Sequence, residues 1–308
     1  MAPPRVLVDC DPGHDDAIAL VLAARHTELV GITTVAGNVP LARTTANALA
    51  VTELLGVDVP VHAGAERPLI APLHTAEAVH GKTGLDGAAI PAPSRSAASA
   101  DGVGFLIDRI RAEEGLWIVA IGPLTNVALA FRHAPDLAGR LAGVSLMGGS
   151  ATYGNRSATA EFNVWADPEA AAIVFESGAR ILMSGLHLTM QLLATQDRRD
   201  ALRGTGTRTG AILADLLTFY ARAYARYRGF DGPAVHDACA VLAITHPDLF
   251  AGSDAHVVVE TAGRHTRGMT VVDRRPLAQP PAPTAHVLDT IDHDAAFAVI
   301  TKAAAAYP

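Results

Sequence analysis

Short apolar runs along the chain alternate with longer segments in which apolar residues recur every three or four positions. The first pattern predicts strands, and the second predicts helices. Strands that are apolar throughout, separated by helices, are typical of a parallel sheet that is covered on both faces. We therefore predict an α/β fold with an open, mostly parallel sheet and helices on both faces. The expected strands are 5–9, 29–35, 59–61, 116–121, 143–147, 180–183, 256–259 and 270–272. The expected helices are 17–24, 41–55, 101–112, one that follows 122–126 and ends near 132–133, 168–176, 205–228, 236–244 and a closing one from about 294.

Residues 63–99 break this alternation. The segment contains Pro68, Pro72, Pro91 and Pro93 and shows little helical or strand periodicity. A loop of this length inside a compact domain usually has a function. We predict that it forms a lid-like loop within a single domain that spans residues 1–308.

One part of this loop resembles a phosphate-binding P-loop. Gly81, Lys82 and Thr83 match the end of that motif, but Ala76 stands where the motif requires its first glycine. No apolar strand precedes the segment either. We therefore reject a P-loop here.

Acidic residues concentrate directly after the first predicted strand. Asp9, Asp11, Asp15 and Asp16 place four carboxylates within eight residues, and no Lys or Arg occurs between Arg5 and Arg25. Neighbouring carboxylates repel one another unless a positive charge lies among them. Because ligands that offer only oxygen favour a hard ion, the sequence predicts a bound Ca²⁺ or Mg²⁺.

A simpler interpretation is that Asp15 and Asp16 only stabilise the start of the following helix, where acidic residues are favourable. It does not explain all four acids. Pro12 and Gly13 separate the two pairs and allow the chain to turn sharply, so that both limbs can direct oxygens to one point.

Further polar residues follow other predicted strands. Asn38 and Thr125 lie just beyond the ends of strands 29–35 and 116–121, and Met147 ends strand 143–147. In open parallel sheets, ligands bind at the carboxyl ends of the strands. We therefore expect these residues and Asp11 to lie around one site.

Composition narrows the class of ligand. The net charge is −7 and no basic run is present, which argues against a nucleic-acid partner and favours a small molecule. The chain contains 2 cysteines, which suits a reducing compartment, and we expect a cytoplasmic protein. No uninterrupted apolar stretch is long enough to predict a membrane span.

Seven short motifs recur along the chain. The most specific is DxDPGxDD at residues 9–16, and the six supporting ones lie at 32–38, 122–126, 147–149, 154–155, 160–163 and 236–238. Together they resemble the motifs of the calcium-dependent nucleoside hydrolases of the inosine-uridine type. This resemblance implies hydrolysis of the N-glycosidic bond of a ribonucleoside to free base and ribose, a role in nucleoside salvage, and a homodimer or homotetramer.

The resemblance also implies a role for individual residues. A calcium ion is expected to be held by Asp11, Asp16, Asp237 and the main-chain carbonyl of Thr125. Asp11 is also the expected proton acceptor, and Asp9 is expected to support the site without binding the metal. The residues expected to contact the ribose are Asp15, Met147, Asn155, Glu161 and Asn163, with Asn38 near the sugar and the attacking water, and His80 and His236 are expected to reach the base.

Tyr220 and Tyr224 lie one helical turn apart on the predicted helix 205–228, which also carries Phe219 and Tyr227. Such a pair is most often part of an apolar core. Together with His236, however, it resembles the nonspecific members of the family, which implies that purine and pyrimidine ribonucleosides are both accepted. A pyrimidine-specific enzyme is the alternative.

Two other functions remain open. Haloacid dehalogenase-like phosphatases also begin with Asp-x-Asp after a strand, but they need a suitably placed lysine, and this chain contains only Lys82 and Lys302. A nucleoside-binding protein without activity is the second. It would have no need for a carboxylate such as Asp11 that can activate water.

Overall fold

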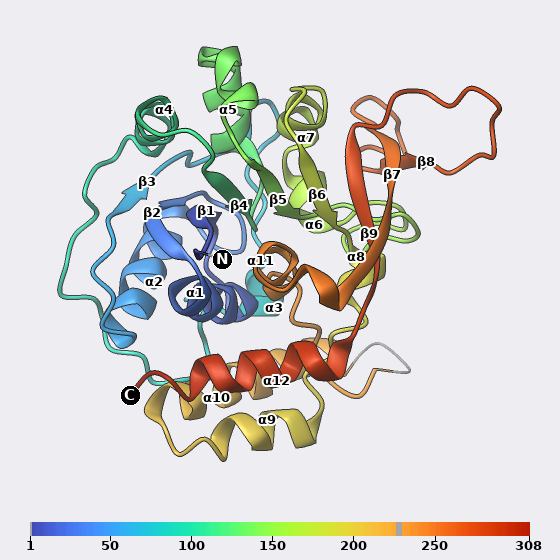
Figure 1. Cartoon of the computed structure of the whole chain (residues 1–308). Coiled ribbons are helices and arrows are strands. Elements are labelled where there is room, and N and C mark those ends of the chain that lie inside the picture. Colours follow the sequence, from blue (N-terminus) through green and yellow to red (C-terminus); the bar gives the residue numbers. More distant parts are fainter. Residues whose placement is uncertain (1, 226–229) are drawn as a thin grey trace.

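The computed structural model describes residues 2–225 and 230–308, which form a nine-stranded sheet with helices on both faces (Figure 1). Seven neighbouring strands run parallel, and the last two continue the sheet antiparallel. The predicted fold class is confirmed. In sheet order the strands are β3 (Val61–Ala63), β2 (Glu28–Thr34), β1 (Arg5–Cys10), β4 (Trp117–Ala120), β5 (Gly143–Met147), β6 (Ile181–Ser184), β9 (Ala285–Ile291), β7 (Phe250–Val259) and β8 (Thr270–Asp273).

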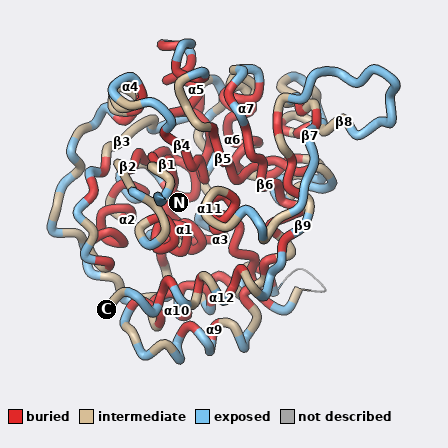
Figure 2. The backbone as a smooth tube through the Cα atoms, viewed as in Figure 1, coloured by how far each residue is buried: buried red, intermediate tan, exposed pale blue. Residues whose placement is uncertain are grey.

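Helices cover both faces of the sheet, and on one face further helices pack on the outside of α1 (His14–His26). Strand β1 shows why both faces are covered, because Val6 and Val8 enter one apolar core while Leu7, between them, enters the other. Figure 2 shows the resulting buried centre. The first core contains α1 (His14–His26), α2 (Leu41–Leu54) and α11 (Ala238–Thr245), with α10 (Arg208–Tyr224) and α12 (His293–Ala304) packed against α1, and the second contains α4 (Gly102–Ala112), α5 (Thr125–His133) and α7 (Pro168–Phe175).

Several elements differ from the prediction. Strand β9 and helices α8 (Leu186–Thr189) and α9 (Gln196–Arg203) were not predicted, and β7 begins before the expected strand 256–259. Strand β9 contains His286, Asp289 and Thr290, so it lacks the continuous apolar run that marks the other parallel strands. Its place between β6 and β7 is a tertiary feature. The predicted helix 205–228 is α10 up to Tyr224, whereas Tyr227 lies outside the described residues.

The remaining helices are short, and they are α3 (Glu77–His80), α6 (Phe162–Ala166), η1 (Pro135–Gly139) and η2 (Pro247–Leu249). Among all helices of the described residues, none combines the length and the apolar character needed to cross a bilayer.

Order along the sheet defines where a ligand can bind. From β1 the chain proceeds to β2 and β3 on one side and then crosses to β4 on the other side of β1. The connections after β1 and β4 therefore diverge and leave a crevice at their carboxyl ends. Asp11 and Gly122 lie in these two connections.

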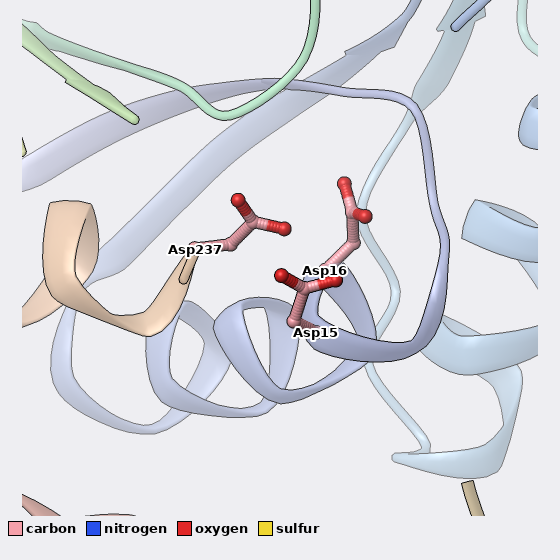
Figure 3. Close-up of side chains that lie close together, drawn as sticks. All are labelled: Asp15, Asp16 and Asp237. Carbon is pink, nitrogen blue, oxygen red and sulfur yellow. The ribbon is translucent and has the colours of Figure 1, made fainter. Parts of the chain in front are cut away.

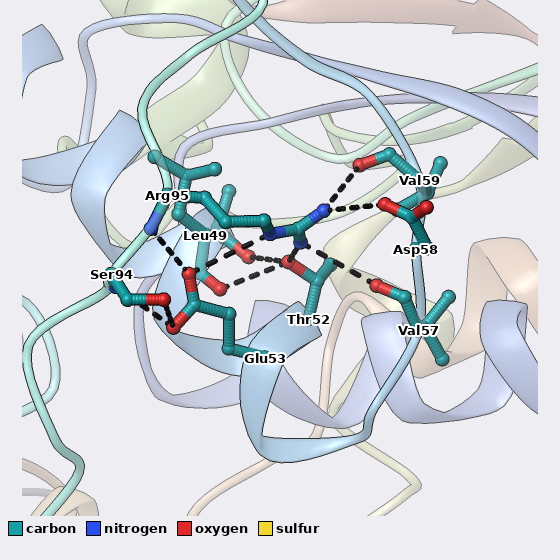
Figure 4. A network of polar contacts seen from close by, with 9 residues as sticks. Leu49, Thr52, Glu53, Val57, Asp58, Val59, Ser94 and Arg95 are labelled. Atoms are coloured by element: carbon teal, nitrogen blue, oxygen red, sulfur yellow. Dashed lines mark hydrogen bonds and ion pairs between the residues drawn. The ribbon is translucent and has the colours of Figure 1, made fainter.

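The segment 63–99 is attached to the body of the protein near both ends. The main-chain N–H of Ala65 donates to Oδ1 of Asn126 at 2.8 Å. At the other end, Glu53 on α2 accepts hydrogen bonds from the main-chain N–H groups of Ser94 and Arg95. The guanidinium of Arg95 in turn donates to Asp58, Thr52 and the carbonyls of Val57 and Val59 (Figure 4).

Replacing Glu53 with alanine is expected to lower the midpoint of urea-induced unfolding, because the hydrogen bonds that its carboxylate accepts from Ser94 and Arg95 are lost. Urea titration provides the measurement. Asp108, an exposed acid on α4, supplies the control, and Asp108→Ala is expected to change stability by less than about 0.5 kcal/mol. Equal effects of the two substitutions would contradict a role of Glu53 in holding the segment.

Candidate active site

Three carboxylates meet at the amino end of α1. Asp15 and Asp16 occupy its first turn, and Asp237 precedes α11, which packs against α1. One oxygen from each residue lies within 4.8 Å of the others, and all three side chains are buried. Figure 3 shows the three carboxyl groups converging from these two helices.

Asp16 has two kinds of contact. It accepts hydrogen bonds from the main-chain N–H groups of Asp11 at 3.3 Å and Gly13 at 2.8 Å, so it does stabilise the start of α1, as the simpler interpretation held. It also lies beside Asp237, since one oxygen of each residue lies within 4.8 Å of the other. Carboxylates this close repel one another unless a positive charge lies among them.

The carboxylate of Asp11 is enclosed by two neighbouring loops. Its Oδ2 accepts a hydrogen bond of 2.7 Å from the main-chain N–H of Asn38, whereas its Oδ1 is buried without a hydrogen-bond partner among the described residues. A Cβ at Gly122 would lie 2.6 Å from Oδ1, and one at Gly37 would overlap Oδ2. Glycine is needed at both positions because the loops approach this side chain so closely.

Burial changes the acidity of the whole cluster. It raises the pKa of Asp16 to about 6 and the pKa values of Asp11, Asp15 and Asp237 well above their ordinary range, and the neighbouring carboxylates add to the shift at the latter three. Among the described residues, no lysine or arginine forms an ion pair with any of these four acids.

A divalent cation fits these residues. The donors are carboxylate oxygens, which suit a hard ion, and the partnerless Oδ1 of Asp11 is an orphaned acceptor that such an ion would satisfy. The three-residue cluster contains Asp15, whereas the predicted ligand set contains Asp11 in its place. The ligand role of Asp11 therefore stays a prediction.

Thr125 is the first residue of α5 and is buried. Its hydroxyl donates to Oδ2 of Asp167 at 2.7 Å, and Leu124 is the N-cap residue of the helix. Thr125 therefore does not cap α5 with its side chain. The expected metal contact through its carbonyl stays a prediction.

Asp9, at the end of β1, is held by hydrogen bonds from residues of neighbouring elements. Its Oδ1 accepts hydrogen bonds from Thr33 at 2.6 Å and from Asn126 at 2.8 Å. Asn126 also donates to the carbonyl of Thr34, and it bonds to Ala65 in the segment 63–99. These contacts connect β1, β2, α5 and the segment 63–99 around the site and agree with the supporting role expected for Asp9.

A cavity of about 510 Å³ opens above the carboxylates. Asp237 lines it, whereas Asp11, Asp16 and Thr125 do not, which places most of the expected metal ligands beneath its surface. The structure also brings all ten residues expected to contact substrate to this one cavity: Asp15, Asn38, His80, Met147, Asn155, Glu161, Asn163, Tyr220, Tyr224 and His236.

The polar wall of the cavity is held rigidly. The amide nitrogen of Asn163 donates to the carbonyls of Ile121 and Met147 at 3.1 Å each, and this assigns the amide oxygen as the group left for a ligand. Glu161 accepts from three main-chain N–H groups and caps α6, while burial raises its pKa to about 7. Asn155 accepts from the main-chain N–H of Phe162 at 2.9 Å.

The aromatic wall is connected by hydrogen bonds. The rings of Tyr220 and Tyr224 meet edge to face with centroids 5.3 Å apart. The Tyr224 hydroxyl lies 2.5 Å from Nε2 of His236, whose Nδ1 lies 2.7 Å from the hydroxyl of Thr189. Burial lowers the pKa of His236 to about 4, so its ring is neutral at pH 7.

Sequence reasoning missed His14. The side chain is fully buried, and its ring stacks on those of His80, Phe219 and Tyr220 at centroid distances of 5.2, 5.3 and 5.3 Å. Its Nδ1 lies 3.1 Å from Nδ1 of His80, so His14 holds His80 against the cavity. The sequence did carry a signal for a functional role of His14, because it is a polar residue between Gly13 and Asp15, inside the most specific motif.

Comparison with a family model extends across nearly the whole chain. Residues 6–298 match the model described as inosine-uridine preferring nucleoside hydrolase. Two relatives are similar in sequence over most of their length. The pyrimidine-specific ribonucleoside hydrolase RihA of Shewanella sp. (strain ANA-3) is 41% identical over 98% of this chain and 96% of its own, and RihB of Shigella flexneri serotype 5b, with the same specificity in its name, is 39% identical over 94% and 93%.

Two solved structures are similar in fold. A purine-preferring ribonucleoside hydrolase from Gardnerella vaginalis superimposes with a TM-score of 0.91 at 32% identity and covers 98% of each chain. The plant nucleoside hydrolase PpNRh1 superimposes with a TM-score of 0.92 at 30% identity and covers 99% of each chain.

Proposed function

Because the chain belongs to the inosine-uridine preferring nucleoside hydrolase family, we propose that it cleaves the N-glycosidic bond of purine and pyrimidine ribonucleosides with Asp11 as the catalytic proton acceptor. The observation that carries this proposal is the position of the carboxylate cluster. Asp15 and Asp237 reach the cavity, and the neighbouring Asp11 keeps one buried oxygen without a partner in the described structure.

Departure of the base leaves an oxocarbenium-like sugar, so water must attack as the bond breaks. A carboxylate held in place beside the reacting water can take its proton, and the buried Oδ1 of Asp11, which has no partner in the described part of the chain, offers such an acceptor. The Oδ1 of Asp11 would accept the proton of the attacking water. Asn38 holds the opposite oxygen through its main-chain N–H and so keeps the carboxylate oriented.

The cation that we propose here is calcium, held by Asp11, Asp16, Asp237 and the main-chain carbonyl of Thr125. When bound, it supplies positive charge against the carboxylates and ligand positions for a water and for the ribose hydroxyls. The sugar would then form hydrogen bonds with the side chains of Asp15, Asn155, Glu161 and Asn163, and its ring would lie against Met147. All five of these side chains line the cavity.

We assign the aromatic part of the cavity to the base. This part is formed by His80, His236, Tyr220 and Tyr224. Their rings provide stacking surface, and the Tyr224 hydroxyl and the imidazoles provide hydrogen-bonding groups. Stacking surface accepts a one-ring or a two-ring base, so we propose activity on uridine, cytidine and inosine. The second candidate is activity on pyrimidine ribonucleosides alone, which the names of the RihA and RihB relatives favour.

Incubating the protein with a panel of nucleosides and measuring reducing sugar tests both candidates. We expect ribose from uridine, cytidine and inosine, and a decrease in kcat/KM of about 100-fold or more for 2′-deoxyuridine, because a contact to the missing hydroxyl is lost. Ribose from uridine and cytidine but none from inosine would establish the second candidate. Tight nucleoside binding with no ribose released would instead support a binding protein without activity.

We further propose that the enzyme is a cytoplasmic homodimer or homotetramer. The location is supported by the two cysteines, which are buried free thiols and suit a reducing compartment. The assembly is supported by an apolar surface at the edge of the sheet, where β8 and its neighbour β7 expose Val271 and Val258 directly opposite one another. Light scattering gives the subunit number, and fractionation of the producing cell gives the location.

A further inference from the structure

Asn47 on α2 joins two segments that are far apart in the sequence. Its side chain is buried, and it does not line the cavity. Its Nδ2 donates to the carbonyl of Pro12 at 2.9 Å and to the carbonyl of Thr83 at 2.8 Å. Pro12 belongs to the turn 9–16, which carries the carboxylates, and Thr83 belongs to the segment 63–99. One amide group therefore binds both.

The chemistry of the two partners determines which atom of the amide faces them. A carbonyl oxygen accepts hydrogen bonds and cannot donate them, so the nitrogen of Asn47 must face both carbonyls. Its two hydrogens then serve one carbonyl each. A side chain without an N–H group, such as leucine, would leave both carbonyls without this donor.

The Pro12–Gly13 peptide group is held from both sides. Its carbonyl accepts from Asn47, and its N–H donates to Oδ2 of Asp16 at 2.8 Å. Because the C=O and N–H of a planar trans peptide point in opposite directions, the two hydrogen bonds lie on opposite sides of one rigid unit. Successive hydrogen bonds of this kind polarise one another. The orientation of Asp16, one of the proposed metal ligands, therefore depends on Asn47 through this peptide group.

The segment 63–99 passes close to the turn at the same place. Gly84 has a φ of +88°, and a Cβ added there would lie 2.8 Å from Nδ2 of Asn47 and 3.1 Å from the carbonyl oxygen of Pro12. Glycine at this position allows the close approach. Several residues of 75–80, just before this contact, line the cavity. The bond from Asn47 therefore also holds one wall of the cavity against the turn.

We propose that Asn47 is a positioning residue that fixes the Pro12–Gly13 peptide group, and through it Asp16, for binding of the divalent cation, and that holds the segment 63–99 on the same turn. This inference rests on the proposed function, because it assigns to Asn47 a role toward the proposed metal site. Asn47 would act only through main-chain groups of the turn and of the segment.

The first experiment measures the calcium affinity of chelator-treated protein by isothermal titration calorimetry. Asn47→Leu keeps the branched shape of the side chain and removes both N–H groups. We expect its calcium Kd to rise by about 10-fold or more, as is typical when a residue that orients a metal ligand is lost. Asn47→Ala is a second variant with the same expectation, and circular dichroism shows whether each variant is folded.

Thr45→Val is the matched control. Thr45 is also buried on α2, but its hydroxyl bonds to the hydroxyl of Thr34 on β2, at 2.7 Å, and not to the turn or the segment. We expect the calcium Kd of this variant to stay within about twofold of the parent value.

A second experiment measures hydrogen exchange by mass spectrometry on the same metal-free proteins. We expect faster deuterium uptake in peptides that cover 76–86 for Asn47→Leu, because the segment loses its bond to α2. Uptake in these peptides is expected to be unchanged for Thr45→Val.

The outcomes separate the two proposals. If the parent protein binds no calcium, the proposed metal site fails, and the exchange comparison still decides whether Asn47 holds the segment. If the parent protein binds calcium, a Kd within about twofold of the parent value for folded Asn47→Leu overturns the inference. An equal loss of affinity in Thr45→Val, or unchanged uptake at 76–86 in Asn47→Leu, would also overturn it.

Discussion

Replacing Asp11 with alanine is expected to lower kcat for ribose release by a factor of about 10²–10⁴, the usual cost of removing a positioned base, and by more if a metal ligand is lost as well. The physical reason lies in the two oxygens of this carboxylate. One is fixed by Asn38, and the other is buried without a partner in the described structure, so it is available to take a proton. Steady-state kinetics with uridine and inosine provide the measurement.

Asp9→Asn is the matched control for this substitution. Asp9 lies in the same motif, is equally buried and also keeps one oxygen, Oδ2, without a partner among the described residues. Its Oδ1 accepts from Thr33 and Asn126, and an amide oxygen can keep both bonds. We expect this variant to lose less than about 10-fold in kcat, as is typical of a supporting contact. Activity of Asp11→Ala within about tenfold of the parent enzyme would contradict the assignment of the base.

Removal of divalent metal is expected to abolish activity, and addition of calcium is expected to restore it. The dependence of stability on pH provides a second test of the metal site, because burial raises the pKa values of these carboxyl groups in the folded protein. A raised folded pKa means that the folded state binds more protons than the unfolded state, so metal-free stability falls as pH rises through the interval between the two values. For Asp16 this interval runs from about 3.8 to about 6 and corresponds to about 3 kcal/mol.

Calcium binds the ionised carboxylates, so its stabilising effect should increase with pH. Thermal unfolding at pH 5 and pH 8, each with chelator and with calcium, measures this effect, and we expect the larger increase in Tm at pH 8. Magnesium under the same conditions tests the choice of ion. Full activity after complete metal removal, or a Tm that calcium does not change at either pH, would exclude the metal assignment.

The alternative functions considered from the sequence find little support in the structure. Lys82 is exposed, and its main-chain N–H and that of Thr83 bond to the carboxylate of Asp86, so this segment does not form a phosphate-binding loop. Lys302 lies on α12, and neither lysine lines the cavity. The contacts that a phosphatase of the haloacid dehalogenase-like type would need are therefore missing from the described residues.

Local sequence was sufficient to predict much of the sheet and the acidic turn. Strands such as β5, predicted at 143–147 and observed as Gly143–Met147, are mostly apolar because helices cover both of their faces. Asp11, Asp15 and Asp16 follow β1 within a few residues, so their convergence depends only on the turn at Pro12 and Gly13. These features are short-range, and a short stretch of chain specifies them.

Contacts between distant segments were decided only by the tertiary structure. Asp237 joins Asp15 and Asp16 because α11 packs against α1, more than 200 positions away in sequence. The stacking of His14 on His80 and the bond from Thr189 to His236 also join separate elements, and β9 is a strand because β6 and β7 pair with it. Side-chain periodicity describes which face of an element is buried, but it carries no information about which partner covers that face. Packing of the whole chain selects the partner, and in this protein it completes the site.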